Sequence, residues 1–349
     1  MPLALYTISR KDLFDLLGRL AEINRVFVPY AKGDKLYFDE FDASKEDLIE
    51  LGGIRQSQPL KTFLNPAREK VFNGLTRDPR PAIVVGVKAC DLASLAIQDF
   101  VFEGGDVRDP FYAENRDNTT IIGCDCTYAK ETCFCLAMDG APYPRKDFDL
   151  NLSSVDNYFI VEVGGPKGEA IISGFNVFFK EPSPHARSIR ESSRKAVERQ
   201  VQSYIDKRGI PNTDQIRGVV KKNYDSTDFW KDMASTCVEC GACNLACPTC
   251  HCFLLFDEKD RFGAKRFRIW DACLYNTFAR VAGGANPRKH LYERLRNRFD
   301  KKFDFFPQVM NSFACTGCGR CVEACAGDID IREVLKGLVS GKWNKPPHE

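Results

Sequence analysis

Two runs of four cysteines place the strongest limit on what this chain can fold into. They are Cys237-x2-Cys240-x2-Cys243-x3-Cys247 and Cys315-x2-Cys318-x2-Cys321-x3-Cys325. Three thiolates at such spacing fit three corners of one [4Fe–4S] cube, and in two-cluster ferredoxins the fourth cysteine of each run ligates the other cluster. Structural zinc sites use separated cysteine pairs instead. The spacing therefore predicts two [4Fe–4S] clusters.

The crossed pattern assigns four ligands to each cluster. Cluster 1 is predicted to be held by Cys237, Cys240, Cys243 and Cys325, and cluster 2 by Cys315, Cys318, Cys321 and Cys247. Gly241, Gly317 and Gly319 permit close approach of the backbone to the inorganic core. The second run is followed by Ala326, where the first run has Pro248. Proline shapes the path of the chain but supplies no ligand, so the predicted ligand sets are unchanged.

Composition bears on the compartment and on the kind of partner. The chain has 349 residues with 16 cysteines, and its 50 basic and 48 acidic side chains leave a net charge of +2. This near balance does not indicate a nucleic-acid or membrane-surface protein. The sequence shows no signal peptide and no apolar run long enough to span a bilayer. We expect a soluble, cytoplasmic protein without membrane insertion, whose clustered cysteines are metal ligands or redox groups.

Residues 1–180 are predicted to form an α/β domain. Ser9 and Asp12 have the spacing of a helix capping pair ahead of an amphipathic segment. A helix from about Asp91 to Phe100, between two strands, predicts a parallel βαβ unit. Short apolar runs predict strands at Val26–Pro29, Lys35–Phe38, Ala82–Val87, Thr119–Gly123, Phe159–Val163 and Glu169–Ser173.

The rest of the chain divides into a connector and a cysteine-rich domain. Residues 181–228 are highly charged, with apolar residues at helical spacing, and predict a charged helical connector. Gly209 and Pro211 break this helix, and a second one is expected from Asp214 to Asn223. Residues 229–349 are predicted to form a mainly α-helical ferredoxin-like domain, because the long segment between the two cysteine runs has a mostly helical pattern.

A third group of cysteines lies in the first domain. Cys90 follows the strand that ends at Val87, whereas Cys124 and Cys126 follow the strand that ends at Gly123. Parallel neighbouring strands would bring these thiols to one carboxyl edge of the sheet, where α/β folds bind their ligands. Cys133 and Cys135 lie on the next loop. Four of these thiols could hold a third [4Fe–4S] cluster; the alternative is that they are buried, redox-inert cysteines.

Over nearly its whole length the chain resembles a family of iron–sulfur subunits, exemplified by those of sulfhydrogenase (the β subunit of this cytoplasmic NiFe hydrogenase) and of anaerobic sulfite reductase. The residues that carry the resemblance are Lys61-Thr-Phe-Leu-Asn-Pro-Ala-Arg-Glu69, Ala89-Cys90-Asp91, Cys126, Cys133-Phe-Cys135, Cys247-Pro-Thr-Cys250-x-Cys252, Arg268-x-Trp270-x-x-Cys273, Gly283-Gly284, Arg294, Arg296 and Arg298. Their order and spacing make the match specific.

The resemblance implies both a ligand set and a role. It selects Cys90, Cys126, Cys133 and Cys135 for the third cluster and leaves Cys124 as an extra thiol. In this family such a subunit exchanges electrons with a separate flavoprotein that handles NAD(P)H, while a further metalloenzyme subunit is catalytic. We therefore expect an electron relay in the oxidoreductase complex of an anaerobe, with a flavoprotein on one side and a catalytic subunit or a ferredoxin on the other.

Two other interpretations remain open. The sequence has no G-x-G-x-x-G or P-loop motif, and its four histidines are scattered, so no substrate site of its own is expected. Cys250, Cys252 and Cys273 match family positions, and they could instead help to build a substrate-reducing cluster. Alternatively, the clusters could only stabilise a scaffold.

The segment from Lys259 to Lys302 is locally basic. It contains thirteen lysines and arginines but four carboxylates. Thiolate-ligated clusters are anionic, so nearby cations would ease their burial and raise their reduction potential. The same charges could dock an acidic partner or could form a solvated helix face. The sequence leaves these possibilities open.

Overall fold

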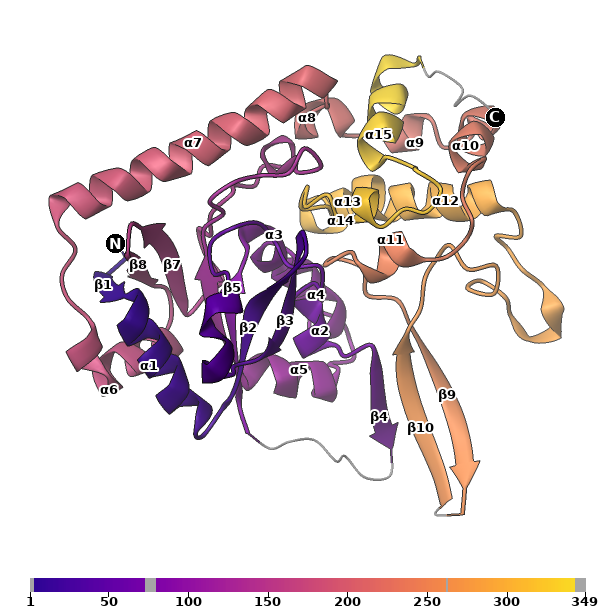
Figure 1. Cartoon of the computed structure of the whole chain (residues 1–349). Coiled ribbons are helices and arrows are strands. Elements are labelled where there is room, and N and C mark those ends of the chain that lie inside the picture. The colour runs from indigo at the N-terminus through magenta and orange to yellow at the C-terminus, as the bar shows by residue number, and fades with distance from the viewer. Residues whose placement is uncertain (1–2, 73–79, 262, 343–349) are drawn as a thin grey trace. The chain divides into compact units, whose positions relative to one another are not determined.

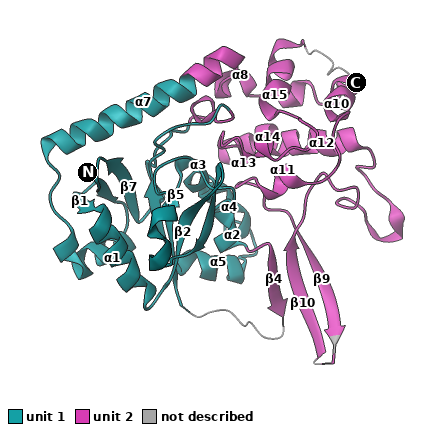
Figure 2. Ribbon diagram, in the orientation of Figure 1, with its two compact units in different colours: residues 1–65, 76–131, 140–202 teal, residues 66–75, 132–139, 203–349 magenta. Residues whose placement is uncertain are grey.

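A computed structural model describes residues 3–72, 80–261 and 263–342 of the chain (Figure 1). Its contacts divide the chain into two compact units (Figure 2). Unit 1 comprises residues 1–65, 76–131 and 140–202, and unit 2 comprises residues 66–75, 132–139 and 203–349. Two short segments from the first half of the sequence thus belong to unit 2. The domain bounds that composition suggested, 1–180, 181–228 and 229–349, stay a prediction.

Unit 1 is built on a seven-stranded mixed sheet in the order β1-β8-β7-β6-β5-β2-β3. Its strands are β1 (Leu5–Ser9), β2 (Arg25–Lys32), β3 (Lys35–Glu40), β5 (Ala82–Val87), β6 (Thr119–Cys124), β7 (Leu150–Val155) and β8 (Tyr158–Val163). The central strands β2, β5, β6 and β7 are parallel, and the outer pairs are antiparallel. The α/β prediction and the parallel β5–β6 pair are therefore confirmed.

Helices cover this sheet because each has one apolar side. They are α1 (Arg10–Ala21), α2 (Lys61–Leu64), α3 (Ala89–Leu92), α4 (Leu95–Phe102), α5 (Pro110–Asp117), α6 (Pro166–Gly174) and α7 (Pro184–Arg208). Helix α1 begins as predicted, since Ser9 Oγ accepts the Asp12 N–H at 3.0 Å. Its buried leucines pack into one hydrophobic core of the sheet, whereas Leu92 and Leu95 pack into a second one.

The strand predicted at Glu169–Ser173 is wrong, because these residues belong to helix α6. Pro166 stands in the first turn of that helix, where its fixed φ and missing N–H are tolerated. Ile171 and Ile172, which suggested a strand, are buried in the core beside α1. A short apolar run does not by itself distinguish a strand from a helix that buries the same residues.

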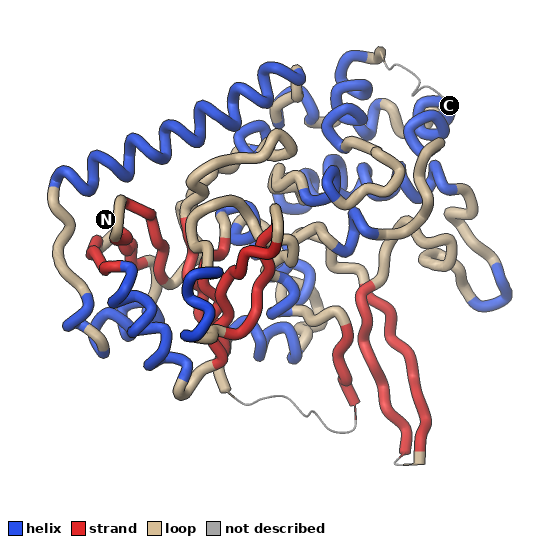
Figure 3. The backbone as a smooth tube through the Cα atoms, in the orientation of Figure 1, coloured by secondary structure: helices blue, strands red, loops and turns tan. Residues whose placement is uncertain are grey.

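Unit 2 combines short helices with a small sheet (Figure 3). The helices are α8 (Thr213–Ile216), α9 (Val219–Lys222), α10 (Thr227–Ala234), α11 (Ala242–Leu245), α12 (Leu291–Asp300), α13 (Phe306–Met310), α14 (Arg320–Glu323) and α15 (Ile331–Ser340), with a π-helical turn, η5 (Lys301–Phe305), after α12. The sheet has the order β4-β10-β9, formed by β4 (Arg68–Phe72), β9 (Phe253–Asp260) and β10 (Gly263–Trp270). The mainly helical description of this part is therefore not confirmed.

Two details differ from the sequence predictions for physical reasons. The helix expected from Asp214 to Asn223 is split into α8 and α9, because Gly218 adopts a left-handed φ of 75° between them. The hairpin β9–β10 replaces the helical pattern expected between the cysteine runs. Strand β10 of this hairpin pairs with β4, and its buried Arg268 forms an ion pair with Glu69 of that strand. That partner strand comes from nearly two hundred residues earlier, so local sequence could not reveal the pairing.

Candidate iron–sulfur centres

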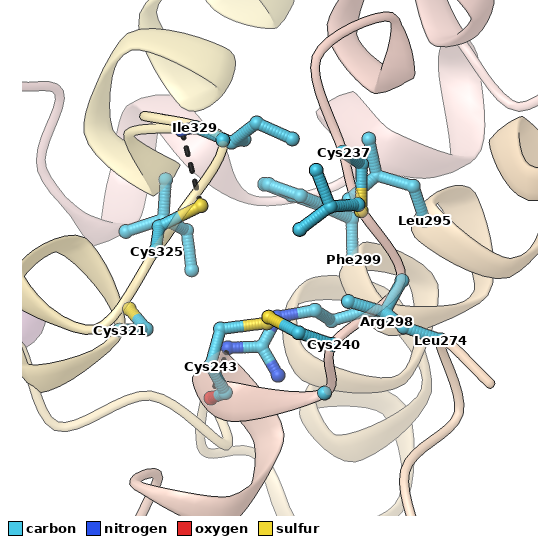
Figure 4. A pocket seen from close by; sticks show the side chains of 14 residues that line it. Cys237, Cys240, Cys243, Leu274, Leu295, Arg298, Phe299, Cys321, Cys325 and Ile329 are labelled. Carbon is cyan, nitrogen blue, oxygen red and sulfur yellow. Dashed lines mark hydrogen bonds between the residues drawn. The ribbon is translucent and has the colours of Figure 1, made fainter.

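A pocket in unit 2 is lined by the whole cysteine set predicted for cluster 1 (Figure 4). Cys237, Cys240, Cys243 and Cys325 face a space of about 520 Å³, part of which is open to solvent. Leu274, Leu295 and Phe299 supply apolar walls. Four thiols around a space with apolar walls fit the donor set of a [4Fe–4S] cluster.

A second pocket of about 300 Å³ is lined by the set predicted for cluster 2. Its walls include Cys247, Cys315, Cys318 and Cys321 together with Phe134, Arg298 and Lys302. The fourth cysteine of each run thus lies with the first three of the other run, the arrangement that the crossed pattern requires. Cys321 also reaches the wall of the first pocket. The ligand assignment itself stays a prediction.

The two runs repeat the same backbone geometry. The second residue after each leading cysteine is left-handed, with φ 57° at Glu239 and 63° at Gly317. The fourth is left-handed as well, with φ 68° at Gly241 and 76° at Gly319, and each of these glycines begins a short helix, α11 or α14. Such turns point consecutive N–H groups inward. A side chain at Gly241 would collide with the Tyr275 ring, which explains the glycine there.

Backbone N–H groups reach the cysteine sulfurs in both pockets. The N–H of Ile329 donates to Cys325 Sγ at 3.2 Å, as the dashed line in Figure 4 shows. The N–H of Glu239 donates to Cys237, and that of Gly317 donates to Cys315. Hydrogen bonds to ligand sulfurs are one of the means by which proteins set cluster potentials.

Two buried cations lie against the pockets. Arg298 of α12 lines both, donating from Nη2 to the Cys243 carbonyl at 3.0 Å and from Nη1 to Cys250 Sγ at 3.5 Å. Lys302 lines only the second pocket, and its Nζ donates to Cys247 Sγ at 3.2 Å, Thr249 Oγ1 at 2.8 Å and the Ala314 carbonyl at 2.9 Å. Sequence reasoning noted the basic segment without singling out these two. Their spacing of four residues, which puts both on one helix face, was the available signal.

The thiol pKa values reflect burial and these cations. Burial raises the pKa of Cys315 to about 12 and also raises the pKa values of Cys237 and Cys243. The pKa of Cys247 moves the opposite way: a hydrogen bond from Cys250, helped by Lys302, holds it well below its ordinary value. Iron binds thiolates. Lys302 thus favours the thiolate form of Cys247.

Three cysteines, Cys250, Cys252 and Cys273, belong to none of the predicted cluster sets, and two of them lie close together. Asn244 Nδ2 donates to Cys273 Sγ at 3.1 Å and to Cys250 Sγ at 3.8 Å, so both thiols share one amide. Cys252 stands just before β9, where its carbonyl accepts the Asp271 N–H at 2.9 Å. Across the described residues, no three His, Cys, Asp or Glu side chains are grouped to hold a single metal ion.

The cysteines of the predicted third set fall in both units. In unit 1, Cys90 lies in α3 after β5, and Cys126 follows β6, so both stand at the carboxyl ends of neighbouring parallel strands. Cys124, the extra thiol, is fully buried in the core there, and burial raises its pKa to about 11. Cys133 and Cys135 belong to unit 2, where Phe134 between them donates its N–H to the Gly317 carbonyl at 2.9 Å. Ligation by this set stays a prediction.

Comparison with known proteins agrees with the pockets. Residues 236–329 match the family described as the 4Fe-4S dicluster domain. The chain is also 30% identical over 337 residues to "Sulfhydrogenase 2 subunit beta" of Pyrococcus furiosus, a match that covers 93% of this chain and 96% of the relative. No helix among the described residues is long and apolar enough to cross a membrane. The chain belongs to the family of iron–sulfur subunits that includes the sulfhydrogenase β subunit.

Proposed function

We propose that this chain is the iron–sulfur electron-transfer subunit of a multi-subunit oxidoreductase. It relays electrons between a flavoprotein subunit that handles NAD(P)H and a catalytic metalloenzyme subunit or a ferredoxin. The observation that supports this most is the pair of neighbouring pockets, each lined by the four cysteines predicted for one cluster, and each such set is drawn from both runs. Two one-electron centres side by side serve transfer between partners, and the sequence offers no nucleotide or flavin motif with which to complete a reaction alone.

The residues have separate tasks in this proposal. Cys237, Cys240, Cys243 and Cys325 hold cluster 1, and Cys315, Cys318, Cys321 and Cys247 hold cluster 2. When bound, each cluster accepts and releases one electron at a time. Arg298 and Lys302 offset the negative charge that the thiolates bring into a buried site, and the N–H donors of Glu239, Gly317 and Ile329 stabilise it further.

A third [4Fe–4S] cluster on Cys90, Cys126, Cys133 and Cys135 extends the relay. The family resemblance supports this set, and so does the position of Cys90 and Cys126 at one edge of the parallel sheet. The subunit name of the Pyrococcus furiosus relative supports a place in a larger complex. The proposed setting is cytoplasmic, in an anaerobe.

Crossed ligation can be tested with two serine variants of the anaerobically purified chain. Cys247→Ser should chiefly damage cluster 2, and Cys325→Ser should chiefly damage cluster 1, each measured by iron content and electron paramagnetic resonance. Cys124→Ser serves as the control and should keep all the iron. If each variant instead loses the cluster of its own run, ligation is not crossed.

The relay itself is tested by reduction of the clusters. The isolated chain should not oxidise NAD(P)H, whereas addition of its flavoprotein subunit should let NAD(P)H reduce the clusters. Cys133→Ser should interrupt transfer between the partners while the complex still assembles. Substrate turnover by the isolated chain would instead favour the reductase that Cys250, Cys252 and Cys273 suggested.

A further inference from the structure

Cys240 differs from every other cysteine in its exposure. Of the 16 cysteines, all of which lie within the described residues, Cys240 is exposed, and the others are buried or half-buried. Its neighbour Val238 is an apolar residue with 61% of its surface exposed. In the second pocket, Cys247 and Cys318 are buried. Of the two pockets, the first therefore has the ligand that a partner protein could approach most closely.

A loop is fixed beside Cys240 by one buried arginine. Arg294 is only 1% exposed, and its Nη2 pairs with the Glu239 carboxylate at 2.8 Å. Its Nε donates to the Leu274 carbonyl at 3.1 Å, and its Nη1 donates to the carbonyls of Arg288 and Lys289 at 3.1 and 2.8 Å. Residues 275–289 are thus held at both ends against the residue that precedes Cys240. The Tyr275 ring, packed over Gly241, adds a further contact.

This loop is positive and carries no acidic side chain. Between Asp271 and Glu293 the sequence has Arg280, Arg288, Lys289 and His290 but no carboxylate. Arg280 and Lys289 are exposed, and so is the apolar Val281, at 56%. The one carboxylate within the first cysteine run, Glu239, is already paired with Arg294. The loop whose ends are held beside Glu239 therefore presents exposed cations and no carboxylate, and the cysteine run itself presents the exposed apolar Val238.

We propose that Val238, Cys240 and residues 276–289, which we call the basic rim, form the docking surface for an acidic one-electron carrier protein of the ferredoxin type. The inference rests on the proposed function, because cluster 1 must be an electron-transfer centre. One electron leaves the reduced carrier and reduces this chain, or the reverse, and no proton or group moves. Complementary charge would guide the encounter, and the exposed Val238 would allow close apolar contact beside the exposed Cys240.

The test uses the full chain, reduced anaerobically with dithionite and mixed in a stopped-flow instrument with one of two oxidised probes. One probe is an acidic clostridial-type ferredoxin and the other is basic cytochrome c. The double variant Arg280→Glu/Lys289→Glu should slow transfer to the ferredoxin on the order of 10-fold at low salt and speed transfer to cytochrome c, and both effects should fade at high salt. The transfer rates of Arg280→Gln/Lys289→Gln should lie between those of the glutamate double variant and those of the wild type.

The control is Lys11→Glu, which reverses one exposed lysine on α1 of unit 1 and should leave both rates unchanged. Iron content establishes that each variant holds its clusters. If the wild type and the glutamate variant transfer electrons to the ferredoxin at equal rates and both have normal iron content, the basic rim is not the docking surface. The proposed function would then remain intact. A wild-type chain that contains iron yet exchanges electrons with neither probe would overturn both.

Discussion

The backbone N–H of Phe134 donates to the carbonyl oxygen of Gly317 at 2.9 Å. This bond joins the Cys133–Cys135 segment to the turn between Cys315 and Cys318, and the Phe134 side chain continues into the wall of the second pocket. The segment 132–139 belongs to unit 2, and its Phe134 lines the second pocket. Cys133 and Cys135 are thus tied through Phe134 to the turn that carries two of the predicted cluster 2 ligands.

Replacement of Gly317 should disturb cluster 2 selectively. A Cβ on Gly317→Ala would stand 2.5 Å from the Phe134 carbonyl oxygen and 2.6 Å from Cys135 Cα, and both are backbone atoms that cannot turn aside. We expect iron content to fall by about a third, the share of cluster 2 among the three proposed clusters, with the cluster 1 signal retained. Gly218→Ala is the matched control, since Gly218 also has a positive φ but open space around it. Both variants carry the left-handed strain of about 1–2 kcal/mol, so equal iron loss in the two would contradict the contact argument.

Removal of the buried ammonium of Lys302 should lower the potential of cluster 2. Lys302→Met keeps much of the side-chain volume but loses the donor 3.2 Å from Cys247 Sγ. Without this cation the reduced, more negative cluster is less stable, so we expect a decrease on the order of 60 mV, the equivalent of a tenfold change for one electron. A redox titration followed by electron paramagnetic resonance measures it. The control is Lys301→Met, which replaces the exposed neighbour and should leave the potential of cluster 2 unchanged.

Arg298 should behave differently because it lines both pockets. Arg298→Met removes a cation shared by the two sites, so the potentials of both clusters should fall in the same titration. The contrast with Lys302→Met is the informative result: one variant moves a single potential and the other moves two. A shift confined to one cluster in Arg298→Met would show that the shared position has no electrostatic effect on the other.

Cys124 should be inert in the folded protein. Its side chain is fully buried and burial raises its pKa to about 11, so at pH 8 almost all of it is the unreactive thiol. We expect iodoacetamide to leave Cys124 unmodified in the native chain and to modify it after unfolding in guanidinium, as read by peptide mass spectrometry. The exposed Cys240 of cluster-free protein provides the reactive comparison. Rapid native modification of Cys124 would mean that this part of the β-sheet opens.

Much of unit 1 was predictable because its signals are local. The strand Ala82–Val87 was predicted with the bounds that the structure has, and the Ser9–Asp12 cap begins α1 as expected. Prediction failed where the same residues suit two structures, as with Ile171 and Ile172, which pack into the core from a helix. It missed β1 and β7, which both pair antiparallel with β8.

By itself the sequence determined the two cysteine sets that line the two pockets, because the spacing of ligands within each run limits how one loop can surround a cube. Only the tertiary structure decided what surrounds those sets. Lys302 reaches Cys247 across 55 residues of sequence, and Phe134 reaches Gly317 across a still longer stretch. Such contacts depend on how distant segments pack, and local spacing carries no record of that packing.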